Sequence, residues 1–281
     1  MSSRRDAVKT LAALAAAGLF PRATRAGAMP PDAIERIGLQ LYTVRSLMTR
    51  DMPGTIAAVA AAGYREVEFA GYFGRTPTQV RQLLDAHGLT APSTHVGLDA
   101  VREQFGATAE SAQTLGIRYL TVASLDMRAI KTADDWKRMA DVFNDVGRRA
   151  KSAGLRFAFH NHSVEFTPVD GAVPMDLLIR GTDPSLVAFE LDLFWAMKAG
   201  QDPRAYFERH PGRFEMVHVK DATAAPASDM TDVGAGVMDW TQIFAARTTA
   251  GIRHYFVEHD NPADPMQSIR RSADYLRTLR F

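Results

Sequence analysis

The sequence contains no cysteine, and this absence removes several kinds of chemistry at once. A chain without cysteine has no disulfide framework, no thiolate metal site and no thiol nucleophile. Disulfides are dispensable in a chain of 281 residues, so their absence alone does not decide the compartment. Catalytic and metal-binding residues must therefore be sought among other side chains.

The chain also lacks an excess of charge of either sign. It has 33 lysines and arginines against 32 aspartates and glutamates, a formal net charge of +1, and the two kinds are interleaved. A nucleic-acid enzyme usually shows a basic face, so we expect no nucleic-acid partner. The content of 46% hydrophobic and 23% charged residues is ordinary for a globular protein with a sizeable core.

The amino terminus has the order of a cleavable targeting segment. Paired arginines, Arg4 and Arg5, precede an alanine-rich apolar run from Leu11 to Phe20, which is too short to span a bilayer. Ala26-Gly27-Ala28 then supplies a small-x-small cleavage pattern. This order resembles a bacterial twin-arginine signal.

The alternative is an amphipathic helix belonging to the folded domain, and Pro21, Pro30 and Pro31 would interrupt such a helix. We therefore expect a twin-arginine-type signal peptide over residues 1–28 and a mature domain over residues 29–281. Export would place the protein in the periplasm, with no membrane contact after signal cleavage. Whether it forms a homo-oligomer is left open.

After Pro31 the chain repeats a cycle of apolar strand, turn and amphipathic helix. Glycines such as Gly116 and Gly154 follow several helical patterns, where they favour a left-handed C-cap. Helices are clearest at Thr55–Ala62, Thr78–Ala86, Thr108–Leu115, Trp136–Ala153, Tyr206–His210, Trp240–Ala246 and from Pro265 to about Leu279. The expected strands are Ile37–Tyr42, Glu66–Ala70, Thr90–His95, Tyr119–Val122, Phe157–His160, Val187–Leu191, Phe214–Val219 and Tyr255–Glu258.

Eight strands alternating with helices predict parallel pairing through right-handed crossovers. Eight strands also close a barrel, so we expect an α/β protein with a single-domain (β/α)₈ TIM barrel fold. A doubly wound open sheet is the alternative, and no Gly-x-Gly-x-x-Gly follows the first strand to support it. No Pro-, Gly- or Ser-rich linker divides residues 32–281, and Ala222–Asp232 is expected to be a long loop over the barrel mouth.

Polar residues gather where the predicted strands end. In a barrel the carboxyl ends of all strands converge on one face, which brings residues from distant parts of the chain together. Carboxylates and imidazoles that converge in this way suit one divalent metal ion, such as Mn²⁺, Mg²⁺, Co²⁺ or Zn²⁺. The set comprises Gln40, Glu68, His95, His160, Asn161, His162, Glu165, Glu190, Asp192, His218, Lys220, Asp221, Glu258 and His259.

Each of these residues also has a structural interpretation. Asp192 stands where it would cap the following helix, and His218 lies inside an apolar run typical of a hydrogen-bonded core histidine. An unpaired carboxylate at Glu258, which ends a buried run, would be costly. Lys220 and Asp221 are a potential local ion pair, and Gln40 a structural hydrogen-bonding residue.

The segments at these strand ends resemble the xylose isomerase-like TIM barrel superfamily, in its sugar phosphate isomerase/epimerase branch. They occur in order over nearly the whole mature domain. The matching segments are Gly38–Arg45, Tyr64–Gly71, Ser93–Leu98, Phe159–His162 with Glu165-Phe166, Glu190–Asp192, His218–Asp221, Val233–Gly236 with Asp239-Trp240, and Val257-Glu258.

This resemblance implies one divalent ion held by residues from strands five to eight. Asp192, His218 and Glu258 match strands six, seven and eight, whereas His160-Asn161-His162 stands where many relatives have Glu-Asn-His. Glu165 is the expected strand-five ligand, with His160 as the alternative. Relatives with two glutamates use them as an acid/base pair, which implies catalytic roles for Glu165 and Glu258, or for His160.

Substrate contacts are expected from Glu68, His95, His162 and Lys220. The implied activity is isomerisation or epimerisation of a small sugar through proton abstraction beside a carbonyl, by way of an enediolate. Export favours a non-phosphorylated sugar or keto-sugar. A 3-keto-glycoside lyase or hydratase and an inosose-dehydratase-like enzyme remain alternatives, as does a sugar-binding barrel without catalysis. A zinc endonuclease of the same superfamily is disfavoured by the near-neutral charge.

Overall fold

The computed structural model describes residues 32–281. These residues belong to one compact unit, so the described part contains nearly all of the barrel domain expected over residues 29–281. The signal peptide expected over residues 1–28 lies outside the described residues. No helix of the described part combines the length and the apolar character that a membrane crossing requires.

Within this part, eight parallel strands close into a barrel in the order β1-β10-β7-β6-β5-β4-β3-β2. Pairing of β1 with β10, where Leu39 lies opposite Val257, closes the ring. The predicted (β/α)₈ barrel is therefore confirmed. The strands are β1 Ile37–Gln40, β2 Glu66–Phe69, β3 Thr90–Val96, β4 Tyr119–Val122, β5 Arg156–His160, β6 Val187–Asp192, β7 Phe214–Val219 and β10 His254–Val257.

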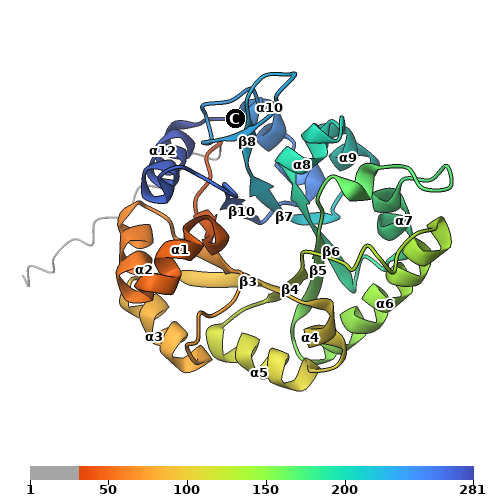
Figure 1. Cartoon of the computed structure of the whole chain (residues 1–281), viewed down its shortest axis with the longest axis horizontal. Coiled ribbons are helices and arrows are strands. Elements are labelled where there is room, and N and C mark those ends of the chain that lie inside the picture. Colours follow the sequence, from red (N-terminus) through yellow and green to blue (C-terminus); the bar gives the residue numbers. More distant parts are fainter. Residues whose placement is uncertain (1–31) are drawn as a thin grey trace, which may run out of the picture. The chain divides into compact units, whose positions relative to one another are not determined.

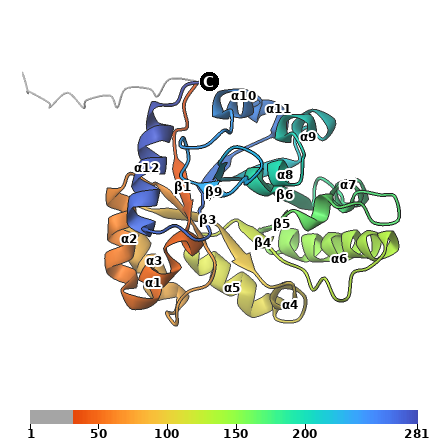
Figure 2. The same cartoon turned by 45° about the horizontal axis from the view of Figure 1, so that its top comes forward.

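Helices surround the strands on the outside of the ring (Figure 1). The helices of this outer layer are α2 Met52–Ala61, α3 Pro77–Ala86, α5 Phe105–Leu115, α6 Ala133–Ser152, α7 Pro174–Gly181, α9 Pro203–Arg209, α10 Trp240–Ala245 and α12 Pro265–Thr278. Both Figure 1 and Figure 2 show α12 beside α2. There Tyr64 donates a hydrogen bond to the Ile269 carbonyl, which ties the last helix to the start of the ring.

Short elements follow the carboxyl ends of the strands and build the barrel mouth. They are the 3₁₀ helices η1 Leu41–Val44 and η2 Val164–Phe166, the helices α1 Arg45–Arg50, α4 Leu98–Arg102 and α8 Leu193–Lys198, and the strands β8 Asp221–Ala222 and β9 Met230–Thr231. The short helix α11 Arg247–Ala250 instead follows α10 and precedes the amino end of β10. The strand expected to reach Tyr42 ends at Gln40, because its side chain accepts a hydrogen bond from the Tyr42 amide and starts η1. The loop expected over Ala222–Asp232 is instead a hairpin in which β8 pairs with β9.

The helix boundaries follow local signals in the sequence. Thr132 and Asp135 form a reciprocal capping box that starts α6, so this helix begins three residues before the predicted Trp136. Gly116 ends α5 with a φ of 73°, and Gly154 after α6 has the same value, as predicted for left-handed C-caps.

Two hydrophobic layers hold the barrel together. The larger one lies between the strands and the helices, and the smaller one fills the ring itself with Tyr119, Ala158, Ala188, Met216 and Phe256. These five side chains are fully buried. Because they block the centre of the ring, the polar residues above them face a closed floor rather than a channel.

Replacing Gly147 by alanine should lower the free energy of unfolding by about 1–3 kcal/mol. A Cβ atom at this position in α6 would lie 2.9 Å from the Leu186 carbonyl oxygen, and backbone yields poorly. Gly106 in α5 is the matched control, because an added Cβ meets nothing within 4 Å. Urea unfolding should show Gly106→Ala as neutral or stabilising by up to about 1 kcal/mol. Equal effects of the two changes would contradict this packing.

Candidate active site and metal centre

A cavity of about 270 Å³ opens among the carboxyl ends of the strands. This volume lies near the lower end of the range for small-molecule pockets, about 300–1,000 Å³, and suits a ligand of monosaccharide size. Of the residues predicted to bind substrate, His95, His162 and Lys220 line it. The full lining is Tyr42, Ala70, His95, Ala123, Ser124, His160, His162, Lys220, Glu258 and Asp260.

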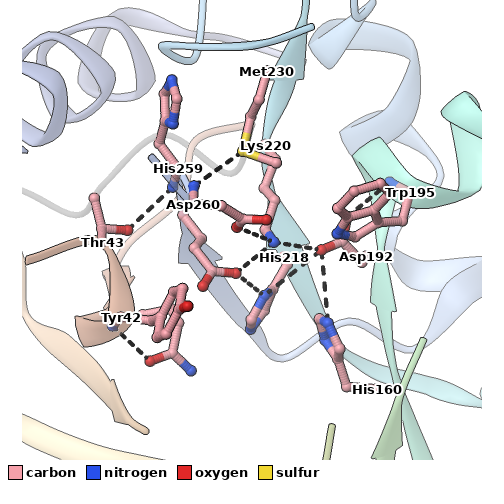
Figure 3. A network of polar contacts seen from close by, with 12 residues as sticks. Tyr42, Thr43, His160, Asp192, Trp195, His218, Lys220, Met230, His259 and Asp260 are labelled. Carbon is pink, nitrogen blue, oxygen red and sulfur yellow. Dashed lines mark hydrogen bonds and ion pairs between the residues drawn. The ribbon is translucent and has the colours of Figure 1, made fainter. Parts of the chain in front are cut away.

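Asp192, His218 and Glu258 meet beside this cavity, as the sequence led us to expect. Each offers a ligand atom, and these atoms all lie within 4.8 Å of one another. His218 Nδ1 is 2.8 Å from Glu258 Oε2 and 3.9 Å from Asp192 Oδ2. The three side chains come from the ends of β6, β7 and β10, and Figure 3 shows Asp192 and His218 side by side.

The backbone explains how Asp192 reaches this position. Its Oδ1 caps α8 by accepting a hydrogen bond from the Trp195 amide at 2.9 Å, so the capping role considered from the sequence is real. Its Oδ2 is buried and faces the cluster, with Lys220 Nζ 3.0 Å away. One carboxylate therefore anchors the helix with one oxygen and presents the other to the site.

Lys220 supplies a fixed positive charge at the same place. Its Nζ lies 2.6 Å from Glu258 Oε2, 2.8 Å from Asp260 Oδ1 and 3.0 Å from Asp192 Oδ2 (Figure 3). Burial lowers the pKa of Lys220, but these three carboxylates outweigh burial and hold its pKa above the usual range. The local ion pair with Asp221 is not formed, and Lys220 is instead part of the site.

Asp221 has a different task. Its carboxylate is fully buried and accepts hydrogen bonds from the amides of Gly234, Gly236 and Met238 and from Trp240 Nε1. These contacts hold the segment after β9 against the end of β7. Asp221 therefore supports the mouth without facing the cavity.

Glu68 lies below the cavity and not in its lining. Its side chain is fully buried, with Oε2 2.7 Å from both His218 Nε2 and Gln40 Nε2, and Oε1 2.5 Å from Ser93 Oγ. This placement does not support the expected substrate contact. Gln40 has the structural hydrogen-bonding role considered from the sequence.

His95 joins the cavity wall to the buried carboxylates. Its Nε2 is 2.9 Å from Glu190 Oε2 and 3.2 Å from Glu68 Oε2. Burial lowers the pKa of His95, but the Glu68 charge and the hydrogen bonds to Glu190 and Glu68 outweigh it and raise the pKa to about 9. His95 is therefore a proton donor at neutral pH.

The two histidines of β5 and its loop differ from His95. Burial, reinforced by the charge of His218, holds the pKa of His160 well below its usual range. Burial and the Lys220 charge lower the pKa of His162 to about 4. Both rings are therefore neutral at physiological pH, and both line the cavity.

The structure separates the two candidates for the strand-five ligand. Glu165 lies in η2, where its Oε2 accepts a hydrogen bond from the His162 amide at 2.8 Å and closes its own turn. Among the described residues, two groups of side chains converge closely enough to hold a metal ion: Asp192, His218 and Glu258, and His95, His160, Glu190 and His218. Glu165 belongs to neither group. His160 Nε2, in contrast, lies 3.7 Å from Asp192 Oδ2. The geometry therefore favours His160, which the sequence offered only as the alternative to Glu165.

Two acidic residues gained a role that the sequence had not assigned to them. Glu190 lies two residues before Asp192 on β6, and Asp260 lies two residues after Glu258. Residues two apart on a strand share a face, which is the signal that identifies Glu190. Asp260 follows the end of β10, where strand parity no longer applies.

These residues fit a divalent metal ion. Carboxylate oxygen and imidazole nitrogen are the donors that such ions take, and Asp192 Oδ2, which forms an ion pair with Lys220, faces the other donors. Asp192, His218 and Glu258 would hold the ion, with His160 as the neighbouring imidazole.

The sequence and the fold of this chain are similar to those of known proteins. The chain is 23% identical over 262 residues to inosose dehydratase from Geobacillus thermodenitrificans, covering 79% of this chain and 87% of that protein. A sugar phosphate isomerase/epimerase from Parabacteroides distasonis superposes with a TM-score of 0.78 and 27% identity, covering 89% of this chain and 95% of the other.

The IolI protein, solved with a bound zinc atom, shares the fold with a TM-score of 0.71 at 15% identity, over 85% of this chain and 95% of that one. The family described as xylose isomerase-like TIM barrel matches residues 56–279. That match spans most of the chain and all strands from β2 to β10. The protein belongs to the xylose isomerase-like TIM barrel family.

Proposed function

We propose that this protein is a divalent-metal-dependent enzyme that isomerises or epimerises a non-phosphorylated sugar or keto-sugar. One observation carries the proposal: the donor atoms of Asp192, His218 and Glu258 lie within 4.8 Å of one another beside an open cavity of monosaccharide size. The similarity to a sugar phosphate isomerase/epimerase over 89% of this chain supports it.

The reaction is the movement of a proton beside a carbonyl group. A bound divalent cation supplies Lewis-acid polarisation of the carbonyl oxygen. Glu258 lines the cavity and accepts the proton from the neighbouring carbon. His160 lines the same cavity and stands beside the position of the cation. His95 donates to a substrate oxygen from the cavity wall, and His162 and Lys220 bind substrate hydroxyl groups. Transfer of the proton back to a different carbon gives an isomer, and to the opposite face an epimer.

The charge of the cavity supports a neutral substrate. Lys220 is the only lysine or arginine in the described lining, and Asp192, Glu258 and Asp260 already surround its ammonium group. A phosphate group there would meet Glu258 and Asp260. Two like charges 4 Å apart near a protein surface repel by about 4 kcal/mol. A sugar without phosphate avoids this repulsion.

Dehydration or β-elimination is the second candidate. The similarity to inosose dehydratase over 79% of this chain favours it. Elimination begins with the same proton abstraction, and His95, with a pKa of about 9, is suited to protonate a leaving hydroxyl or glycosidic oxygen. An inosose or a 3-keto-glycoside would be the corresponding substrate.

Replacing His218 by alanine should abolish metal-dependent turnover while the barrel stays folded. The variant loses the imidazole nitrogen that would bind the metal, and we expect kcat/KM to fall by about 100- to 1,000-fold. The measurement is solvent deuterium incorporation at the carbon beside the carbonyl, over a panel of keto-sugars, inososes and 3-keto-glycosides. Product analysis then separates isomers from elimination products.

His87→Ala is the matched control, because His87 is exposed at the end of α3 and precedes the amino end of β3, opposite the carboxyl ends that form the site. It should exchange deuterium like the wild-type protein. Exchange that persists in His218→Ala with metal bound would refute the ligand assignment. Binding of these sugars by metal-loaded wild type without any exchange would identify a sugar-binding barrel instead of an enzyme.

A phosphate group on the substrate should reduce catalysis. For a sugar and its phosphate ester with the same reacting carbons, we expect kcat/KM to be at least about tenfold lower for the ester, a difference of about 1.4 kcal/mol. Asp260→Asn removes one of the repelling charges and should bring kcat/KM for the ester closer to that for the sugar. A preference of the wild-type protein for the ester would refute the neutral substrate.

We also propose that residues 1–28 direct export to the periplasm, from the paired arginines, the apolar run and the small-x-small pattern. Replacing Arg4 and Arg5 by lysine should retain the full chain in the cytoplasm on cell fractionation. Replacing Arg22 and Arg25, which lie after the apolar run, is the control and should leave export intact. Unchanged distribution of the Arg4/Arg5 variant would contradict a twin-arginine signal.

A further inference from the structure

The polar residues of the barrel mouth form two layers with two histidine rings between them. The lower layer, buried below the cavity, contains the carboxylates of Glu68 and Glu190. The upper layer contains the carboxylates of Asp192 and Glu258. The rings of His160 and His218 lie between the layers, with their centres 4.4 Å apart.

Each ring directs one nitrogen to each layer. His160 Nδ1 is 3.1 Å from Glu190 Oε2, and its Nε2 is 3.7 Å from Asp192 Oδ2. His218 is turned the other way. Its Nε2 is 2.7 Å from Glu68 Oε2 and 3.2 Å from Glu190 Oε2, and its Nδ1 faces Glu258 Oε2 at 2.8 Å and Asp192 Oδ2 at 3.9 Å.

A neutral imidazole has one N–H donor and one lone pair, and an ionised carboxylate only accepts. A carboxylate at hydrogen-bond distance therefore holds the proton on the nitrogen that faces it. His218 has a carboxylate at hydrogen-bond distance on both sides, Glu68 at Nε2 and Glu258 at Nδ1, so its proton is confined to Nε2 only when Glu258 binds a cation instead. With a cation bound, the lower carboxylates would hold the protons on His160 Nδ1 and His218 Nε2. The lone pairs of His160 Nε2 and His218 Nδ1 then point at the upper layer, where the proposed cation would bind.

Glu190 stands out because it touches both rings. Its Oε2 lies within 3.2 Å of nitrogens from His95, His160 and His218, and its Oε1 is buried without a hydrogen-bond partner. A buried carboxylate with one unsatisfied oxygen is unfavourable for folding alone. Its position is explained if it orients the two rings.

We propose that Glu190, assisted by Glu68, is a positioning residue that fixes the tautomers of His160 and His218 and so aims both lone pairs at the metal position. This inference rests on the proposed function, because it assumes a cation held by Asp192, His218 and Glu258. It also assigns His160 as the strand-five ligand and gives Glu68 a role beneath the site rather than at the substrate.

The first test measures the Zn²⁺ dissociation constant of the full chain by calorimetry. Glu190→Gln removes the charge but keeps the size of the side chain, and we expect it to weaken Zn²⁺ binding by about 10- to 100-fold. Glu66→Gln is the matched control. Glu66 is also a buried strand glutamate bonded to a histidine, with its Oε2 2.8 Å from His254 Nδ1, but it lies at the opposite end of the barrel strands.

We expect Glu66→Gln to bind Zn²⁺ as the wild-type protein does, even if its thermal stability falls. An unchanged Zn²⁺ affinity in Glu190→Gln would overturn the inference. So would a second equivalent of Zn²⁺ in the wild-type protein that disappears in Glu190→Gln, because the lower layer would then be a cation site itself.

The second test needs no variant at Glu190. Long-range ¹H–¹⁵N spectra of the Zn²⁺-loaded protein with labelled histidine report which ring nitrogen carries the proton. We expect Nδ1–H in His160 and Nε2–H in His218, assigned through His160→Gln and His218→Gln. A proton on either of the opposite nitrogens would overturn the inference.

Asp192→Asn separates failure of the inference from failure of the proposed function. If Asp192→Asn loses Zn²⁺ while Glu190→Gln keeps it, the metal site stands and the positioning role is refuted. If Asp192→Asn binds Zn²⁺ as tightly as the wild-type protein, the proposed metal site itself is refuted.

Discussion

The compensation of buried negative charge at the barrel mouth is the constraint on which the rest of this structure depends. Glu68, Glu190, Asp192 and Glu258 are almost completely buried within one small volume. Ionised carboxylates are too costly to bury without partners. The strands therefore bring cationic groups to the same level, and these partners are imidazoles and one ammonium group. An imidazole can give up a proton and bind a metal ion, and the ammonium group can give up a carboxylate contact to the ion. The neutralisation of the buried carboxylates is therefore reversible.

The opposite end of the barrel solves the same problem in a different way. Glu215 there pairs with Arg156 and accepts a hydrogen bond from Tyr119, and Glu66 pairs with Arg36 and His254. Guanidinium groups stay charged and are not displaced by a metal. The ion pairs at the amino ends of the strands are thus permanent, whereas the carboxyl ends keep donor atoms that a cation and a substrate can use. The carboxylates at both ends are buried, but their cationic partners differ. This difference gives one end of the strands a stabilising role and the other end a functional one.

The strands and three of the site residues were predictable because their signals are local. A buried strand ending in a charged residue, as at Asp192 and Glu258, identifies a barrel-mouth residue without knowledge of its neighbours. Glu190 carried the same kind of signal through strand parity but was not assigned a role. The direction of Glu165 was not predictable, for a physical reason. It lies in η2, outside the regular strand, where its carboxylate accepts a hydrogen bond from the His162 amide and no periodicity predicts where the side chain points.

The sequence by itself determined the order of strands and helices, the closed barrel and the family, because hydrophobic periodicity, capping residues and glycine ends act within a few residues of one another. Tertiary structure alone decided which nitrogen of His160 and His218 faces which carboxylate, that Glu68 lies beneath the cavity, and that Lys220 contacts three acids rather than Asp221. These outcomes depend on pairing among β2, β5, β6, β7 and β10. Distances between side chains on such separate strands follow only from the closure of the ring.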